Sequence, residues 1–298
     1  MAAYPNLLII GAMKCGTTYL HELLAGHPEI FMSTPKEPCF FVDPRELARG
    51  WPQMARAGYS GDEDRYLALF AAAGDCRYRG ESSTLYTLAP ILSGVPGRIR
   101  AHCPDPRLIY LMRDPLTRTL SHWWHDTRVS RSLRPARTAL DPGSEYLIAS
   151  DYHGQLLPYV ETFGRERVLA LTFEALVARP REVLDRIFRW LGVAPGHVPA
   201  DLDIPRNVGS DSAMVGRLGG QRLYRLRHSK LGKALVDPLP WRARAAFAKG
   251  WEHPVRRSDL DTAAVRAHLR GIQQPQTERL ADLLGRDFPE WTALHGSG

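Results

Sequence analysis

A turn near the start of the chain has the residues to bind an anion. Gly11 and Gly16 are separated by four residues, and Thr17 and Thr18 follow where an apolar run leads into a helix. The glycines allow a tight turn, and the N–H groups and dipole of the following helix attract negative charge. The spacing is that of a nucleotide-binding phosphate loop, but Thr17 stands where a lysine should follow the second glycine, and Lys14 lies within the turn. A lysine at that point reaches the outer end of a 5′-diphosphate-like group rather than the β- and γ-phosphates.

A second pair of anion-binding side chains follows another apolar run, Arg107–Met112. Arg113 comes directly after this run, and Ser121 falls on the next predicted helix, on one face with Thr117 and Trp124. A fork-shaped guanidinium and a hydroxyl suit a second phosphate, separate from the first. Arg113 by itself could equally pair with a carboxylate.

Alternating strands and helices would position both pairs. Leu7–Ile10, Arg107–Met112 and Val168–Phe173 are short apolar runs typical of buried parallel strands, and each is followed by a helix signal. After the last run, residues 174–191 carry one apolar stripe that ends at Gly192. We therefore predict an α/β fold, a P-loop-type parallel sheet with helices on both faces. Ligands of such sheets bind beyond the carboxyl ends of the strands, so both anion sites should lie at one edge.

The composition indicates a single soluble domain over residues 1–298. The chain is 44% hydrophobic and 24% charged, ordinary values for a globular protein. Its four cysteines have no CxxC spacing and no zinc-like pairing with histidines, which indicates reduced thiols. We recognise neither a signal peptide nor an apolar stretch long enough to span a bilayer, so we expect a cytoplasmic protein. Helices are expected from about 260 to about 290.

The positive charge is concentrated near the carboxyl end. Between Arg217 and Arg257 there are eleven Lys and Arg residues and two acidic ones, whereas the whole chain carries a net charge of +7. We predict a basic helical segment at about 216–260. Such a segment could contact a phosphate-rich ligand or an anionic lipid surface, or it could be an ordinary solvated helix.

Taken together, the motifs resemble those of sulfotransferases that use 3′-phosphoadenosine 5′-phosphosulfate (PAPS). The segment Leu8–Thr18, with His27 and Pro28 closing the helix, resembles their 5′-phosphosulfate loop, and Arg113–Ser121 resembles their 3′-phosphate motif. Lys36–Phe41 resembles the acidic, diaromatic segment of the carbohydrate and bacterial small-molecule O-sulfotransferase branch, which includes heparan sulfate sulfotransferases. The resemblance covers roughly residues 5–190, and two motifs in the correct order and spacing make it specific.

The resemblance implies transfer of a sulfuryl group from PAPS to a hydroxyl or amine of a carbohydrate, lipid or secondary-metabolite acceptor. Adenosine 3′,5′-bisphosphate would be the product, and no metal would be needed. By the same resemblance Arg113 and Ser121 hold the 3′-phosphate, Lys14 stabilises the leaving phosphate, and Glu37 is the base. Glu37 could instead only pair with Lys36 or cap a turn. The residues implied for the 5′-phosphosulfate are Lys14, Cys15, Gly16, Thr17 and Thr18.

Two segments depart from the family pattern. Ser82, in Glu81-Ser-Ser-Thr84, stands where the carbohydrate branch often carries a second lysine. The family's basic Lys-Gly-Arg loop near the carboxyl end has only Gly216-Arg217 as a candidate. Three further residues have open roles, because they could bind or simply pack: His122 and His125, which lack a third metal ligand, and Tyr152, in a segment that resembles one bordering the donor site.

Two other functions compete with sulfuryl transfer. The first is a P-loop kinase or NTPase, because Leu108–Asp114 imitates the apolar strand whose terminal aspartate positions magnesium, although the Gly-Lys-Ser/Thr sequence is missing. The second is a non-catalytic binder of polyanions through the basic segment. No aromatic-basic RNA signature accompanies that segment, so we expect no nucleic-acid partner, whereas peripheral membrane contact is compatible with catalysis.

Overall fold

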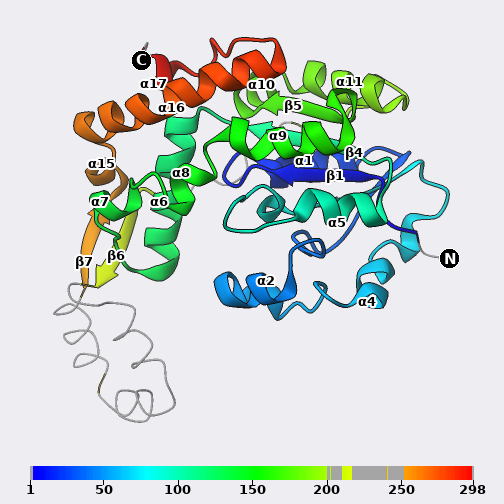
Figure 1. Ribbon diagram of the computed structural model, residues 1–298, viewed down its shortest axis with the longest axis horizontal. Coiled ribbons are helices and arrows are strands. Elements are labelled where there is room, and N and C mark those ends of the chain that lie inside the picture. The colour runs from blue at the N-terminus through cyan, green and yellow to red at the C-terminus, as the bar shows by residue number, and fades with distance from the viewer. Residues whose placement is uncertain (1–2, 200–201, 203–209, 217–239, 241–251, 297–298) are drawn as a thin grey trace.

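The centre of the protein is a five-stranded parallel sheet with strand order β2-β3-β1-β4-β5. The structure is a computed structural model that describes residues 3–199, 202, 210–216, 240 and 252–296. Helices lie on both sides of the sheet (Figure 1), so the predicted architecture, a single α/β domain, is confirmed. The strands of the sheet are β1 (Leu7–Gly11), β2 (Ile30–Met32), β3 (Tyr78–Ser82), β4 (Arg107–Met112) and β5 (Val168–Thr172).

The helices connect these strands and continue beyond them to the carboxyl end. The longest, α16, crosses the upper part of Figure 1, and its contacts reach both α6 and α9. The helices are α1 (Thr17–Ala25), α2 (Pro44–Gly50), α3 (Pro52–Ala55), α4 (Glu63–Ala68), α5 (Val95–His102), α6 (Pro115–Ser130), α7 (Ala136–Ala139), α8 (Glu145–Ile148), α9 (Tyr152–Phe163), α10 (Phe173–Ala178), α11 (Pro180–Leu191), α15 (Arg257–Leu260), α16 (Ala263–Leu284) and α17 (Thr292–His295).

The strand order brings three loops together at one edge of the sheet. β1 lies between β3 and β4, with Ile9 paired to Ser82 on one side and to Ile109 on the other. All three strands are parallel, so their carboxyl ends point the same way. The turn after β1 therefore has the end of β3 on one side and Arg113, after β4, on the other.

The start of α6 follows the sequence prediction closely. Asp114 accepts hydrogen bonds from the backbone N–H groups of Leu116, at 3.0 Å, and Thr117, at 3.2 Å, and Pro115 takes the first helical position. The second Asp114 oxygen accepts from the Leu294 N–H at 3.0 Å. One carboxylate thus begins the helix that follows Arg113 and fastens the carboxyl-terminal segment to it.

The strands β2 and β3 were not predicted. β2 has only three residues, and β3 contains Gly80 and Glu81, residue types that are uncommon in strands. Gly80 is required by packing, because a Cβ atom there would lie 2.3 Å from the sulfur of Met32 on the neighbouring strand. The formation of β3 therefore depends on the close approach of two strands, and no local sequence pattern predicts such an approach.

The helix predicted over 174–191 is two helices. α10 ends at Ala178 and α11 begins at Pro180, with Arg179 between them at φ −141° and ψ 60°. Proline has no N–H to donate and pushes the preceding residue out of the helical region. The apolar stripe continues across the break, which is why the periodicity alone did not reveal it.

The basic segment falls mostly outside the described residues, which omit 217–239 and 241–251. Within the described part, Glu252–Arg256 form the strand β7, antiparallel to β6 (Ser212–Gly216), so the helix prediction is wrong there. β6 is not among the predicted strands either. The reason is tertiary, because Val215 and Val255 are buried in the apolar cluster that includes Trp124 of α6. None of the helices that the structure describes is both long and apolar enough to cross a membrane.

Candidate active site

The turn after β1 forms a narrow loop over the start of α1. Its shape depends on Gly16, whose φ is 87° and whose position would place a Cβ atom 2.6 Å from the ring of Phe173. Lys14 also has a left-handed backbone, with φ 67°. Cys15 and Thr17 are buried, Lys14 is half-buried and Thr18 is exposed. The loop therefore presents a lysine and a helix start toward the carboxyl edge of the sheet.

Left-handed backbone at non-glycine residues is concentrated in two loops. Of the described residues with positive φ other than glycine, Lys14, Glu37 and Cys39 belong to these loops, and Arg131 lies elsewhere. Such conformations cost free energy and persist where the surrounding structure enforces them, which is common at functional sites. The left-handed backbone therefore indicates that the turn containing Lys14 and the turn containing Glu37 belong to a functional site.

Positive charge gathers around Lys14. Burial lowers the pKa of Lys14, and repulsion from Arg128, Arg113 and Arg118 lowers it further, whereas Asp126 acts in the opposite direction. Like charges placed this close repel one another unless an anion lies between them. The loop is therefore electrostatically prepared for a ligand of several negative charges.

Arg113 lies beside the loop, as the sequence predicted. Its guanidinium carbon sits 5.1 Å from the centre of the Phe173 ring, and that same ring packs against Gly16. The stacking fixes the direction of the guanidinium while leaving its N–H groups able to donate. The ring of Phe173 thus contacts both anion-binding motifs, although these motifs are about a hundred residues apart in the chain.

Ser121 lies on a partly exposed face of α6. Ser121 and Thr117 are half-exposed and follow each other at helical spacing, whereas Trp124 is buried and donates to the Ser210 carbonyl at 3.0 Å. Ser121 therefore shares one face of α6 with Thr117 and Trp124, as predicted, and Trp124 is the buried member of that face. This face begins directly after Arg113.

The Glu37 carboxylate is held by donors from two directions. Thr84 donates its backbone N–H to Oε2 at 2.8 Å and its hydroxyl to Oε1 at 3.1 Å, and Lys36 donates to Oε1 at 2.7 Å. The Glu37 N–H donates to the carbonyl of Ser82 at 2.9 Å. The end of β3 thus clamps both the backbone and the side chain of this residue.

Lys36 connects this carboxylate to the phosphate loop. In addition to Glu37, its ammonium donates to the hydroxyl of Thr17 at 3.3 Å, and its side chain is 19% exposed. Ser82 is engaged elsewhere, because its hydroxyl lies 2.8 Å from Nδ1 of His21. The predicted pairing of Lys36 with Glu37 is therefore present, but it is one link of a chain that reaches the start of α1.

The buried carboxylate of Glu81 holds residues next to this clamp. Glu81 is fully buried and accepts from the hydroxyls of Tyr66 at 3.1 Å, Tyr86 at 2.5 Å and Ser83 at 2.8 Å. Ser83 in turn accepts the N–H of Cys39 at 3.0 Å. Burial raises the pKa of Glu81 to about 7, although the three hydroxyl donors act in the opposite direction.

Glu81→Gln is expected to flatten the pH dependence of stability. The folded Glu81 holds its proton up to about pH 7, against an ordinary pKa of 4.5, so the folded state binds more protons between these values. The free energy of unfolding should then fall as pH rises from 4.5 through 7, by about 3 kcal/mol from this group. Urea unfolding of both proteins at pH 5 and pH 8 measures this change. Parallel pH profiles for the wild type and the variant would contradict it.

Arg118 is a buried cation directly beneath the loop. Its side chain is fully buried and donates to the Ser150 hydroxyl at 2.6 Å, to the Met13 carbonyl at 3.3 Å and to the Tyr146 carbonyl. Its hydrogen-bond partners among the described residues are neutral, and burial lowers its pKa. An uncompensated buried charge is costly, so an anion bound at the loop would stabilise this arrangement.

The two histidines of α6 lie in different surroundings. His122 is buried, 3.4 Å from the Arg118 guanidinium and perpendicular to the Tyr146 ring, and burial lowers its pKa. His125 is exposed, and partial burial together with Lys14 lowers its pKa. The described residues contain no group of three or more His, Cys, Asp or Glu side chains able to hold a metal ion.

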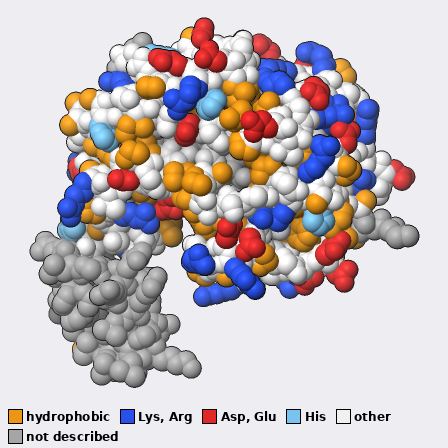
Figure 2. All heavy atoms as spheres, viewed as in Figure 1, with side chains coloured by type: hydrophobic (Ala, Val, Ile, Leu, Met, Phe, Trp, Pro, Cys, Tyr) orange, Lys and Arg blue, Asp and Glu red, His pale blue; other side chains and the backbone are white. Residues whose placement is uncertain are grey.

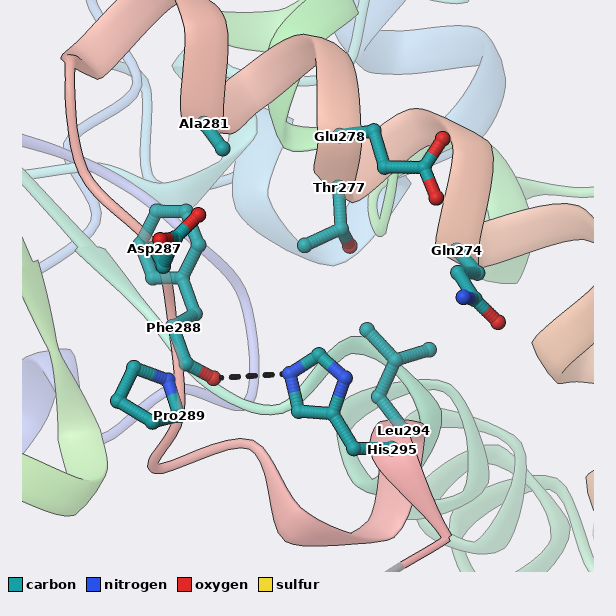
Figure 3. Close-up of a pocket in the computed structure, with 9 residues that line it drawn as sticks. All are labelled: Gln274, Thr277, Glu278, Ala281, Asp287, Phe288, Pro289, Leu294 and His295. Atoms are coloured by element: carbon teal, nitrogen blue, oxygen red, sulfur yellow. Dashed lines mark hydrogen bonds between the residues drawn. The ribbon is translucent and has the colours of Figure 1, made fainter.

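A cavity of about 460 Å³ lies elsewhere, between α16 and the segment that follows it (Figure 3). Its walls are Gln274, Thr277, Glu278 and Ala281 from the helix and residues 287–289, 294 and 295 opposite. His295 closes one side through a hydrogen bond to the Phe288 carbonyl. None of its lining residues belongs to the two loops, so this cavity is separate from the candidate site. Figure 2 shows acidic, basic and apolar side chains interspersed over the described part of one face.

The model of the sulfotransferase family matches residues 5–195, which is more than half of the chain and includes both anion-binding motifs. The chain belongs to the sulfotransferase family. Human heparan sulfate glucosamine 3-O-sulfotransferase 6 is 25% identical over 198 residues, covering 64% of this chain and 53% of the relative. Human heparan sulfate glucosamine 3-O-sulfotransferase 3B1 is 27% identical over 202 residues, covering 63% of this chain and 46% of the relative. The chain spans about half the length of these curated relatives.

Solved structures agree with the fold. The sulfotransferase from Alicyclobacillus acidocaldarius is 24% identical, with a TM-score of 0.69 over 97% of this chain and 99% of that chain. The sulfotransferase domain from the Synechococcus PCC 7002 olefin synthase is 21% identical, with a TM-score of 0.52 over 96% of each chain. Both show that the chain has the fold of these two solved proteins.

Sequence reasoning missed part of the site. It did not single out Arg118, because nothing in a helical pattern marks an arginine that faces inward. It considered Lys36 only as a partner of Glu37 and left Tyr152 between packing and binding. The signal for Tyr152 was the resemblance of its segment, Ser-Asp-Tyr-His-Gly-Gln, to one that borders the donor site in relatives, and this segment begins α9.

Proposed function

We propose that this sulfotransferase moves a sulfuryl group from PAPS to a hydroxyl or amine of a carbohydrate, lipid or secondary-metabolite acceptor. One observation carries the proposal: the Arg113 guanidinium stacks on the Phe173 ring that packs against Gly16, so a cluster of basic residues adjoins the loop after β1, where burial and then repulsion from Arg128, Arg113 and Arg118 lower the pKa of Lys14. A donor with phosphate groups at both ends supplies the charge that this cluster lacks.

The two anion sites suit the two ends of the donor. The loop residues Lys14 to Thr18 would bind the 5′-phosphosulfate through the start of α1, where Gly16 leaves no room for a side chain. Arg113 and Ser121 would bind the 3′-phosphate. Support for this assignment comes from the Phe173 ring, which lies under Arg113 and against Gly16 and so keeps the two sites adjacent.

The proposed reaction is an in-line transfer. The bond between sulfur and the bridging oxygen of the 5′-phosphate breaks, and a bond forms between sulfur and the acceptor oxygen or nitrogen. The acceptor proton passes to the Glu37 carboxylate, and negative charge develops on the bridging oxygen. Lys14 is the group placed to stabilise that charge, which is where preorganised electrostatics contributes most to rate.

Lys36 would align the base with the donor. Its ammonium touches Glu37 and Thr17 at once, so it lies between the group that accepts the proton and the loop that binds the phosphosulfate. It also supplies a cation on the side of the loop where Ser82 is already bonded to His21. We assign Lys36 the task of orienting the carboxylate.

The relatives favour one class among the acceptors considered. Two of them are heparan sulfate glucosamine 3-O-sulfotransferases, which favours a carbohydrate. All four cysteines are free thiols, which supports a reducing compartment such as the cytoplasm.

Binding of the product nucleotide tests the proposal. Calorimetry of the full chain with adenosine 3′,5′-bisphosphate should show saturable binding without added metal, and labelled PAPS should transfer its label to a compound in a host small-molecule extract. Magnesium-dependent turnover of ATP, with no uptake of adenosine 3′,5′-bisphosphate, would favour the kinase alternative and refute the proposal.

A further inference from the structure

The hydroxyl of Tyr152 joins the two anion sites. Tyr152 is the first residue of α9 and is 2% exposed. Its hydroxyl donates to the Arg113 carbonyl at 2.6 Å and accepts the Arg113 N–H at 3.2 Å, so it holds both backbone groups of that residue. The Cys15 sulfur lies 3.6 Å from the same oxygen. The phenolic proton is committed to the Arg113 carbonyl, so any proton in this last contact comes from the thiol, which also has the Met13 carbonyl as an acceptor at 3.7 Å.

The surroundings of Tyr152 leave it little freedom. Its ring packs edge-on against Tyr110 of β4, with centroids 5.9 Å apart, and lies 5.7 Å from the ring of Trp291. Asp151 caps the helix by accepting the Gly154 N–H at 3.3 Å, which fixes the backbone of the first turn. A buried hydroxyl held this way acts as a fixed point between the strand end and the loop.

The residues that it joins serve opposite ends of the proposed donor. Cys15 lies in the loop assigned to the 5′-phosphosulfate, and Arg113 begins the site assigned to the 3′-phosphate. We infer that Tyr152 is a positioning residue that sets the separation of the two anion sites, and so makes the protein select an adenosine phosphorylated at both its 3′ and 5′ ends. The inference rests on the proposed function.

The physical reason is chelation. When two sites are held at the spacing of a ligand's two charged groups, binding of the second group is effectively intramolecular and adds affinity that neither site has alone. If the spacing is allowed to vary, this added affinity falls, but each site keeps its own contacts. Loss of the Tyr152 hydroxyl should therefore affect ligands with two phosphate groups more than ligands with one.

Tyr152→Phe tests this with three nucleotides, namely adenosine 3′,5′-bisphosphate, adenosine 5′-monophosphate and adenosine 3′-monophosphate. Calorimetry should show affinity for the bisphosphate falling by roughly tenfold, while affinity for each monophosphate changes by about twofold or less. Tyr159→Phe is the matched control, because Tyr159 lies on the same helix, is equally buried and donates to the Tyr86 carbonyl at 2.6 Å, away from both sites. That variant should bind all three nucleotides as the wild type does.

A second, less disruptive substitution tests the inference if Tyr152→Phe does not fold. Cys15→Ala keeps the backbone N–H of the loop and the Arg113 contacts but removes the thiol link, so the same pattern is expected with a smaller loss. Equal losses for the bisphosphate and both monophosphates would show a purely structural role, and unchanged binding of the bisphosphate would also overturn the inference. A wild-type protein that binds no bisphosphate would instead refute the proposed function itself.

Discussion

Lys14→Ala is expected to reduce kcat by roughly a hundredfold or more without loss of fold stability. The proposed role of the lysine is to stabilise charge on the leaving phosphate, and a single preorganised donor of this kind is typically worth about 3 kcal/mol in the transition state. In the free protein, however, Lys14 is repelled by Arg113, Arg118 and Arg128. Removing its charge relieves that repulsion, so the melting temperature should stay the same or rise. The initial rate of label transfer from PAPS and thermal unfolding measure the two effects.

The pH dependence of the wild type gives an independent check on the same residue. Because the pKa of Lys14 is lowered from 10.5, the ammonium should lose its proton at a lower pH than an ordinary lysine. The value of kcat/KM reports the free enzyme, so its alkaline decline should begin below pH 10.5. Lys14→Arg, which keeps the charge at all accessible pH values, should shift this decline upward. Turnover at the wild-type rate in Lys14→Ala would refute the role proposed for Lys14.

Glu37→Gln is expected to lower kcat by roughly 10²- to 10⁴-fold while leaving nucleotide binding intact. An amide of the same shape can still accept from the Thr84 N–H, but it cannot take a proton from the acceptor. Affinity for adenosine 3′,5′-bisphosphate should therefore match that of the wild type by calorimetry, because the role proposed for Glu37 is to accept a proton and not to bind the nucleotide. Label transfer from PAPS measures the loss of turnover.

Glu46→Gln is the matched control for that variant. Glu46 accepts the backbone N–H of Ser93 at 3.2 Å and its hydroxyl at 3.0 Å, the same pair of bonds that Glu37 receives from Thr84. If the loss in Glu37→Gln came only from a weakened clamp, Glu46→Gln would show a comparable change in stability, and turnover of both variants would follow stability. Turnover close to wild type in Glu37→Gln would assign the proton to another base.

The fold was largely predictable because its main strands are buried on both faces. Leu7–Gly11 is the central strand, Arg107–Met112 lies beside it and Val168–Thr172 lies at the edge of the sheet, and all three read as continuous apolar runs. β2 and β3 were missed because their positions depend on a close contact between Gly80 and Met32, which is a contact between strands. β7 was missed for a similar reason, since its burial depends on α6.

The sequence by itself determined the phosphate loop and Arg113, the arginine that directly follows β4. Their glycines, lysine and arginine stand at fixed local spacings beside apolar runs, and local spacing is all that such motifs require. The clamp on Glu37, the buried Arg118 and the hydroxyl of Tyr152 were decided only by the tertiary structure. Each of these joins segments that are distant in the chain, and the free energy of such contacts depends on distances that exist only once the sheet has assembled and excluded water.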